Sequence, residues 1–168
     1  MQLLHTLIAY FEDSALADSI RENDNLFPLI ESIHVLAICL VVGSILAVDL
    51  RLLGLASTRQ PISRFTQGVL PLTWCAFAVA VASGSLLFIS NATKYLENGY
   101  FDAKLLLIAA AGVNMMVFHL ISAKDLTRWD SAGKPPPLRA RFAGGISILL
   151  WVAVVACGRW IGFTMKVG

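Results

Sequence analysis

The sequence is poor in charged residues, and this scarcity excludes several classes of protein. Only 14% of its 168 residues are Asp, Glu, Lys or Arg, whereas about a quarter are charged in a typical soluble domain. The formal net charge of +2 is too small to indicate a nucleic-acid-binding protein, and no basic stripe with interleaved aromatic residues occurs. Hydrophobic residues make up 57% of the chain. We therefore expect a helical membrane protein that has the lipid bilayer as its main surroundings.

The sequence also lacks the patterns of a disulfide framework, a zinc site or a hydrolase. Its three cysteines, Cys39, Cys75 and Cys157, fall inside apolar runs without a neighbouring cysteine, so we predict small buried apolar residues. It has no nucleophile with a paired histidine, no phosphate-binding loop and no suitable pair of carboxylates. The first eleven residues lack the basic segment of a cleavable signal peptide. Whether the protein is an enzyme stays open.

The sequence contains four long apolar runs. They cover about residues 29–53, 69–92, 102–123 and 142–163, and each is long enough to cross a hydrocarbon core of about 30 Å as a helix. Residues 26–168 are therefore predicted to form one all-α domain, an integral membrane four-helix bundle.

The segments outside the spans are more polar. In residues 1–25 apolar residues recur at helical spacing among acidic ones, which predicts one or two amphipathic helices lying in the membrane interface. Pro28 suits the first turn of the helix that follows. Residues 91–101 are predicted to be a short polar turn. Residues 124–141 are predicted to be the longest loop, with an extended proline run.

Two features inside the spans predict close contacts between helices. Ala76, Ala80 and Gly84 recur every fourth residue, and such a stripe of small residues lets a neighbouring helix approach closely. Asn114 lies near the middle of the third span, where an amide is typical of a hydrogen bond between helices.

Basic residues are concentrated in two of the three loops between spans. By the positive-inside rule these two loops face the cytoplasm, so both termini face the periplasm. We therefore expect a multi-pass protein of a bacterial inner membrane. The residues that set this orientation are Arg51, Arg59 and Arg64 in the first loop and Lys124, Arg128, Lys134, Arg139 and Arg141 in the third.

Polar residues near the periplasmic ends of the spans fall into one outer layer when depth is counted at about 1.5 Å per residue. Its members come from three spans and the adjacent turn: Glu31, His34, Lys104, Arg159, Tyr95 and Asn98. An ionisable side chain is costly in hydrocarbon, about 2.5–3.5 kcal/mol for Lys or Arg at the centre of a span. His34, Lys104 and Arg159 are therefore predicted to bind a cofactor, although Lys104 or Arg159 alone is also typical of a helix end.

A second, inner layer contains Asp49, Arg51, Arg64 and His119. Asp49 and Arg51 are predicted to be a helix-end charge pair that fixes the orientation of the first span. For His119 two interpretations remain open. It either hydrogen-bonds to a neighbouring carbonyl or to Asp49, or it belongs to a second site for a cofactor or for proton transfer.

Haem b is the leading cofactor hypothesis, because histidines between the helices of a small bundle typically hold haem. His34 and His119 are the candidate metal ligands. His119 lies about 22 Å beyond Lys104 along a straight helix, so His34 and His119 should not bind one iron. The second ligands left open are His5 or Met165 at the outer site and Met115 or water at the inner site. Copper is the alternative metal, because His and Met suit Cu(I).

Several strings of the sequence resemble an uncharacterised family of four-helix bacterial inner-membrane proteins, and the resemblance covers nearly the whole chain. These strings are residues 26–34, 43–44, 49–54, 83–88, 101–106, 114–119 and 147–159.

More distantly, the outline of His34, Gly43, Arg51, Lys104 and His119 is similar to the HemJ-type protoporphyrinogen oxidases and the CopD-type copper-resistance proteins. The resemblance implies an early-span histidine site and redox or copper chemistry. The chain departs from the outline in two ways: it lacks the tryptophan usual before the first-span glycine and the second histidine usual after the first-span arginine.

Three functional hypotheses follow. The first is an inner-membrane redox protein that binds haem b or a quinone and passes electrons to or from a periplasmic partner. The second is a non-catalytic accessory or assembly subunit of a larger membrane complex. The third is a small transporter of copper or another solute, with His34, Asn114 and His119 along its path. Assembly as a homo-oligomer is left open.

Overall fold

Long helices dominate the structure. The computed structural model describes residues 8, 10–56, 62–131 and 136–165, with the backbone alone for residues 63 and 121–131. No strand occurs within these ranges. The helices are α2 (Ala15–Glu22), α3 (Leu26–Leu52), α4 (Ile62–Ser90), α5 (Ala92–Leu96), α6 (Gly99–Ser131) and α7 (Leu138–Thr164).

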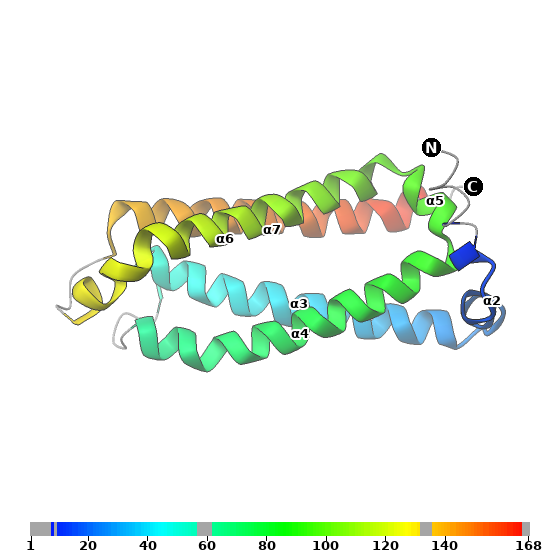
Figure 1. The fold of residues 1–168 in the computed structure, drawn as a ribbon, viewed down its shortest axis with the longest axis horizontal. Helices are drawn as coiled ribbons and strands as arrows, with labels where there is room; N and C mark the ends of the chain where they lie inside the picture. The colour runs from blue at the N-terminus through cyan, green and yellow to red at the C-terminus, as the bar shows by residue number, and fades with distance from the viewer. Residues whose placement is uncertain (1–7, 9, 57–61, 132–135, 166–168) are drawn as a thin grey trace.

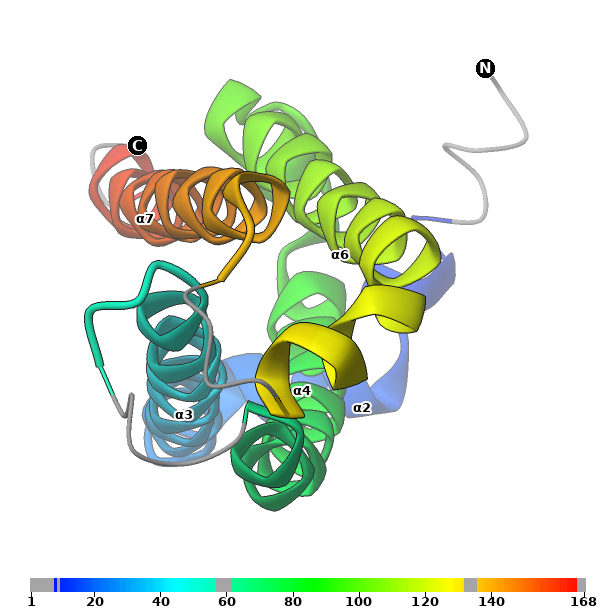
Figure 2. The ribbon, with the colours of Figure 1, turned by 90° about the vertical axis from the view of Figure 1, so that its left-hand side faces the viewer.

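The four long helices form two antiparallel hairpins that pack side by side. Figure 1 shows α3 with α4 and α6 with α7, and the end-on view of Figure 2 shows these four helices around a common axis. The hairpins meet mainly where α3 packs on α7, whereas α4 and α6 are less closely associated. The predicted all-α four-helix bundle is confirmed.

All four long helices are long and apolar enough to cross a membrane. Large apolar side chains such as Leu36, Leu106 and Leu149 are exposed on their outer faces. The span in α6 is the least covered, since 6% of it is buried inside the chain against 22% for α3. Lipid covers such faces without the cost they would have in water. The protein is therefore a multi-pass membrane protein.

The helix boundaries differ from the predicted spans at the polar ends. α3 and α7 match to within a few residues, but α4 begins at Ile62, seven residues before the predicted span, and α6 continues through Ser131. The prediction that residues 124–141 form a loop is therefore wrong at both ends, because residues 124–131 belong to α6 and residues 138–141 to α7. Hydropathy marks where a helix leaves the hydrocarbon, whereas the helix itself can continue into polar sequence, as α6 does through Ser131.

The three cysteines are free, as expected, but they are not all buried by the protein. Cys39 and Cys75 are exposed on α3 and α4, and Cys157 on α7 is partly covered. The prediction of burial is wrong for the first two. A uniformly apolar span does not distinguish its lipid-facing side from its packed side.

The N-terminal helix α2 lies across one end of the bundle, where it contacts α3 and α4 (Figure 1). We call this the outer end, and the opposite one the inner end. Ser14 caps α2 by accepting a hydrogen bond from the Ala17 amide at 3.3 Å, and Ala17 and Ile20 are buried against the bundle. The Arg21 guanidinium donates to the Ser90 carbonyl at the end of α4 at 3.1 Å. α2 is the predicted amphipathic helix outside the spans.

The predicted turn over residues 91–101 contains a short helix, α5. Asn91 and Glu97 flank it, and residues 97–98 join it to α6. The Glu12 carboxylate accepts hydrogen bonds from the Thr93 amide at 3.0 Å and from its hydroxyl at 2.5 Å. The prediction of a simple turn is wrong, because this contact supports one helical turn that is too short to give a periodic pattern.

Small residues set the close contacts between the long helices. The predicted stripe of small residues on α4 lies at a helix contact, as expected, since Ala76 is buried and Gly84 contacts α3. On α7, a Cβ atom at Gly144 would lie 3.1 Å from the backbone oxygen of Asp49 and 3.2 Å from the Leu52 Cβ. α3 and α7 thus touch almost backbone to backbone at this point.

Candidate functional site

His34 on α3 is half-buried and hydrogen-bonds across to α4. Its Nδ1 lies 3.0 Å from the Ser83 Oγ. The Ser83 hydroxyl donates its only proton to the backbone, most closely to the Val79 oxygen at 2.6 Å. The Ser83 oxygen therefore accepts from His34, which places the imidazole proton on Nδ1. The Ala80 carbonyl also lies within hydrogen-bonding reach of the ring, and with the proton on Nδ1 the Nε2 atom of neutral His34 carries a lone pair.

Gly84 fixes the position of the His34 ring. A Cβ atom at residue 84 would lie 2.8 Å from the ring Cε1 and 3.4 Å from Nδ1. Such contacts are too short to occur, so any larger residue would displace the ring. The small-residue stripe on α4 therefore makes room for a functional side chain as well as for a helix.

Lys104 on α6 reaches the same depth from the second hairpin. Its ammonium group is close enough to His34 to interact with it electrostatically. On α7 its Nζ lies 3.7 Å from the position of a Cβ on Gly158, and Cys157 is also near. We call the set His34, Ser83, Gly84, Lys104 and Gly158 the outer polar layer. The residues of this layer come from all four long helices.

No hydrogen bond or ion pair holds the Lys104 ammonium among the residues that the structure describes. Lys104 is only partly exposed, and a buried cation is normally paired with an acceptor or an anion. The outer polar layer thus presents a lone pair on His34 and a positive charge on Lys104.

Three aromatic rings lie one turn outward of this layer. Phe88 on α4, Tyr95 on α5 and Phe101 on α6 have ring centroids 5.4–6.1 Å apart. Phe101 precedes Lys104 by three residues and Phe88 follows Gly84 by four, which is one helical turn in each case. Burial, and to a lesser extent the Glu31 carboxylate, raise the pKa of the Tyr95 phenol. The rings separate the outer polar layer from the outer surface.

Arg159 does not join the outer polar layer. Its guanidinium lies over the Phe163 ring, 4.6 Å from the centroid, and the residue is exposed. This is a cation–π contact within α7. Glu31, also exposed, lies near Tyr95. Of the three predicted cofactor-binding residues of the outer layer, the structure therefore brings together His34 and Lys104.

His119 lies elsewhere, exposed near the inner end of α6. Its Nδ1 is 3.1 Å from the Met115 carbonyl oxygen one turn earlier, and its ring meets the edge of Phe118. α6 is continuous from Lys104 to His119, which separates them by about 22 Å. Among the described residues no group of three or more His, Cys, Asp or Glu side chains could hold a metal. His5 lies outside the described residues.

The inner layer also differs from its prediction. Asp49 and Arg51 end α3 as expected, but both are buried, with exposed fractions of 5% and 7%. The described part of the chain records no ion pair between them, so the predicted charge pair is wrong. Two residues apart on a helix, the side chains point in different directions. Arg64 is exposed on α4, and Asn114 donates to the Ala143 carbonyl at 3.0 Å, the predicted bond between helices.

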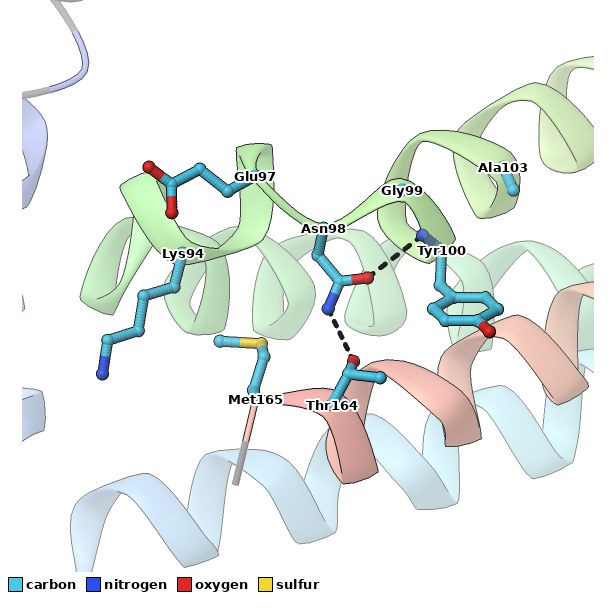
Figure 3. A pocket seen from close by; sticks show the side chains of 8 residues that line it. All are labelled: Lys94, Glu97, Asn98, Gly99, Tyr100, Ala103, Thr164 and Met165. Carbon is cyan, nitrogen blue, oxygen red and sulfur yellow. Dashed lines mark hydrogen bonds between the residues drawn. The ribbon is translucent and has the colours of Figure 1, made fainter. Parts of the chain in front are cut away.

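A separate depression of about 720 Å³ opens at the outer end, between α5, the start of α6 and the last turn of α7 (Figure 3). Asn98 bridges these elements, because its amide donates to the Thr164 hydroxyl at 2.7 Å and its oxygen accepts from the Tyr100 amide at 3.0 Å. Met165 lines this depression and is not placed next to His34. Neither His34 nor Lys104 lines it.

Sequence reasoning missed Ser83, and it missed the role of Gly84 beside His34. Both stand in the string Ala82-Ser83-Gly84-Ser85 within an apolar span. A serine and a glycine together in such a span are a detectable feature, but their partner on another helix is not. The burial of Asp49 was also missed.

One family model matches the chain over residues 25–164, and its description is "Family of unknown function (DUF6644)". No curated protein and no solved structure gives a significant match. These comparisons show no resemblance to HemJ-type or CopD-type proteins.

Proposed function

The chain belongs to this family of unknown function, and from that premise we propose that it is a membrane redox protein that binds haem b at the outer polar layer. The observation that supports the proposal is the hydrogen bond from His34 Nδ1 to Ser83. A histidine that binds a metal through one nitrogen almost always donates its other N–H to a fixed acceptor. His34 has this arrangement, with Nε2 left as the ligand atom.

Lys104 supplies the second element of the fit. Haem b carries two propionate groups, and its insertion between apolar helices requires a cation for them. Lys104 is a partly buried ammonium without an anionic partner in the described part of the chain. Arg159 directly follows Gly158 on α7, but its guanidinium faces the Phe163 ring. Lys104 is therefore the residue proposed to hold a propionate.

The proposed haem would have one protein ligand, His34. His119, about 22 Å from Lys104 along α6, belongs to a different level. The bound group would supply one-electron transfer, and the chain would orient it through His34 and exclude water through the ring cluster of Phe88, Tyr95 and Phe101.

A quinone is the second candidate, because the same two groups suit its head group. The Nε2 lone pair of His34 accepts a proton from a quinol hydroxyl, and the Lys104 ammonium donates to a quinone oxygen. The three aromatic rings one turn outward offer the apolar surface on which a quinone ring packs. Haem and quinone thus compete for one site, and experiment separates them.

We place the protein in a bacterial inner membrane with its outer end in the periplasm. The basic loop residues support this orientation through the positive-inside rule. α2, α5 and the end of α7 lie together at the outer end (Figure 1), as expected when an even number of spans joins them. A periplasmic electron donor or acceptor would therefore approach over α2 and α5, only a few turns from His34.

The test is the absorption spectrum of the purified protein, oxidised and then reduced with dithionite, after expression with a haem precursor. We expect a Soret band and sharp reduced α-bands in the wild type and their loss in His34→Ala. His119→Ala is the matched control, since the other described histidine lies at a different level, and it should retain the spectrum.

Three outcomes would contradict the haem proposal. A colourless wild-type protein from which a quinone is extracted, with the quinone lost in His34→Ala and Lys104→Met, would establish the second candidate. A protein with neither group, recovered with a stoichiometric partner, would favour an accessory subunit. Copper found by elemental analysis in the colourless protein would instead favour the transporter hypothesis.

A further inference from the structure

Asp49 is a carboxyl group buried inside the span part of α3. It precedes the end of the helix by three residues, and its exposed fraction is 5%. Its Oδ2 atom is fully buried and accepts no hydrogen bond. A buried oxygen without a partner is rare in folded proteins and calls for a specific explanation.

The backbone of Asp49 lies at a close contact between the two hairpins. Opposite it on α7, a Cβ at Gly144 would be 3.1 Å from the Asp49 backbone oxygen and 3.6 Å from its Cα. One turn farther along α7, the Ser147 side chain lies within hydrogen-bonding reach of the carboxyl. The group therefore sits between α3 and α7 with one hydroxyl beside it.

Apolar residues close this position from the inner end. Leu52, Ile62 and Ala140 form a cluster with exposed fractions of 4%, 1% and 0%, and Val48 and Phe118 pack against it. Leu52 follows Asp49 by one turn of α3, and Ala140 precedes Gly144 by one turn of α7. The cluster thus lies directly between Asp49 and the inner end.

No described cation faces the carboxyl group from the helices around it. On α3, Arg51 points in another direction and forms no ion pair with Asp49. On α7, Arg139 and Arg141 are exposed.

On α6, the Asn114 amide is bonded to Ala143 and His119 is exposed beside Met115. Among the described residues, no cation other than those named lies near enough to balance an ionised carboxylate at this position, and an unbalanced buried charge is costly in a membrane.

We propose that Asp49 is a proton-binding site inside the membrane part of the bundle, where its carboxyl group is held as a neutral acid between α3 and α7. A proton on the carboxyl group removes a charge that no described cation balances, and the Ser147 hydroxyl lies within reach to donate a hydrogen bond to the same group. The site is distinct from the outer polar layer and does not depend on a redox cofactor. Its failure would therefore leave the haem proposal untouched.

Infrared spectroscopy of the full chain in lipid vesicles at neutral pH tests the protonation state. We expect a carbonyl stretch of a protonated carboxylic acid, above the amide I band, that shifts in D₂O. The band should disappear in Asp49→Asn and remain in Asp102→Asn, the matched control at an exposed position in the first turn of α6. A spectrum without the band, or a band that survives Asp49→Asn, would overturn the proposal.

A second measurement uses the wild type alone, so it does not depend on the folding of a variant. The carboxylic-acid band of the wild type is followed as the pH is raised, with and without added NaCl. It should lose intensity only as the pH rises and should not change with NaCl at constant pH. Loss of the band on addition of Na⁺ at constant pH would show a metal-cation site and would overturn the proposal.

Thermal unfolding gives an independent check. Because Asn is a neutral near-isostere, Asp49→Asn should shift the unfolding midpoint by less than about 3 °C. A larger loss of stability, with Asp102→Asn unchanged, would mean that an ionised Asp49 is stabilised by a charge in the native protein, contrary to the proposal.

Discussion

The two polar levels of the bundle differ in what surrounds them. At the outer polar layer, His34 and Lys104 come from different hairpins, and each has a small glycine beside it. At the inner level, Asp49 is held against Gly144 and closed off by apolar side chains. One apolar bundle thus contains a level with polar groups from both hairpins, where we propose that a ligand binds, and a level where two helices are in close contact. Steric substitutions should therefore act on function at the first and on stability at the second.

The largest effect should come from the inner level. Gly144→Leu adds a side chain where a Cβ would already lie 3.1 Å from the Asp49 oxygen and 3.2 Å from the Leu52 Cβ. We expect a loss of about 2–3 kcal/mol in stability, because helix backbones cannot move apart without opening the α3–α7 contact. Thermal unfolding in detergent, followed by tryptophan fluorescence, measures it.

Gly145→Leu is the matched control, since a Cβ at that position meets nothing within 4 Å. It should leave stability unchanged or slightly raised. Equal destabilisation by the two variants would mean that the inner level is not a specific close contact.

A smaller loss of stability, with a clear functional effect, should follow Gly84→Ala at the outer polar layer. The added methyl group would lie 2.8 Å from the His34 Cε1, so the ring must turn away from Ser83. We expect a loss of about 1–2 kcal/mol and a fall in bound cofactor. Gly43→Ala, where a Cβ meets nothing within 4 Å, should change neither the unfolding midpoint nor the absorbance. Full cofactor content in Gly84→Ala would contradict the assignment of His34 as the ligand.

Asn114→Leu should have a modest effect within the second hairpin. It removes the hydrogen bond to the Ala143 carbonyl, and bonds of this kind between membrane helices contribute about 0.6 kcal/mol on average. Met115→Leu, on the exposed neighbouring side of α6, is the control. If denaturation of Asn114→Leu in mixed micelles showed a loss as large as that of Gly144→Leu, polar bonds rather than close packing would dominate the inner level.

The smallest effect concerns Tyr95, above the outer polar layer. Because burial raises its pKa in the folded state, the unfolded chain releases the phenolic proton first as the pH rises. The contribution of Tyr95 to stability is therefore fully present below pH about 10 and is lost above it. Unfolding midpoints measured from pH 8 to pH 11 should fall less steeply in Tyr95→Phe than in the wild type or in Tyr100→Phe. Parallel curves for all three proteins would show that Tyr95 is not buried.

The sequence predicts the membrane bundle well because each span needs only length and uniform apolarity, which are local properties. It does not predict where α4 begins or α6 ends, since these residues are polar and still helical. Nor does it separate Cys39 on the lipid side from Ala37 on the packed side, because both suit hydrocarbon. The amphipathic pattern that identifies buried faces in water is absent within the spans.

The candidate site was predictable in part. His34 and Lys104 are unusual in apolar spans, and counting residues along the helices is enough to place them at one depth. Counting residues places Arg159 at the same depth, yet its side chain turns toward Phe163. Depth along a helix does not determine the direction of a side chain around it. Ser83, Gly158 and the isolation of Asp49 depend on which helices are neighbours, and that is a property of the fold.

The division into two hairpins also bears on how the protein is made. The α3–α4 hairpin is synthesised first and enters the bilayer before α6 and α7 exist. During that interval Asp49 has neither Gly144 nor Ser147 beside it and must face lipid. A carboxyl group can stay neutral while it faces lipid, whereas an Arg side chain would remain charged there. Membrane insertion thus favours an acid at this position, and the second hairpin then encloses it.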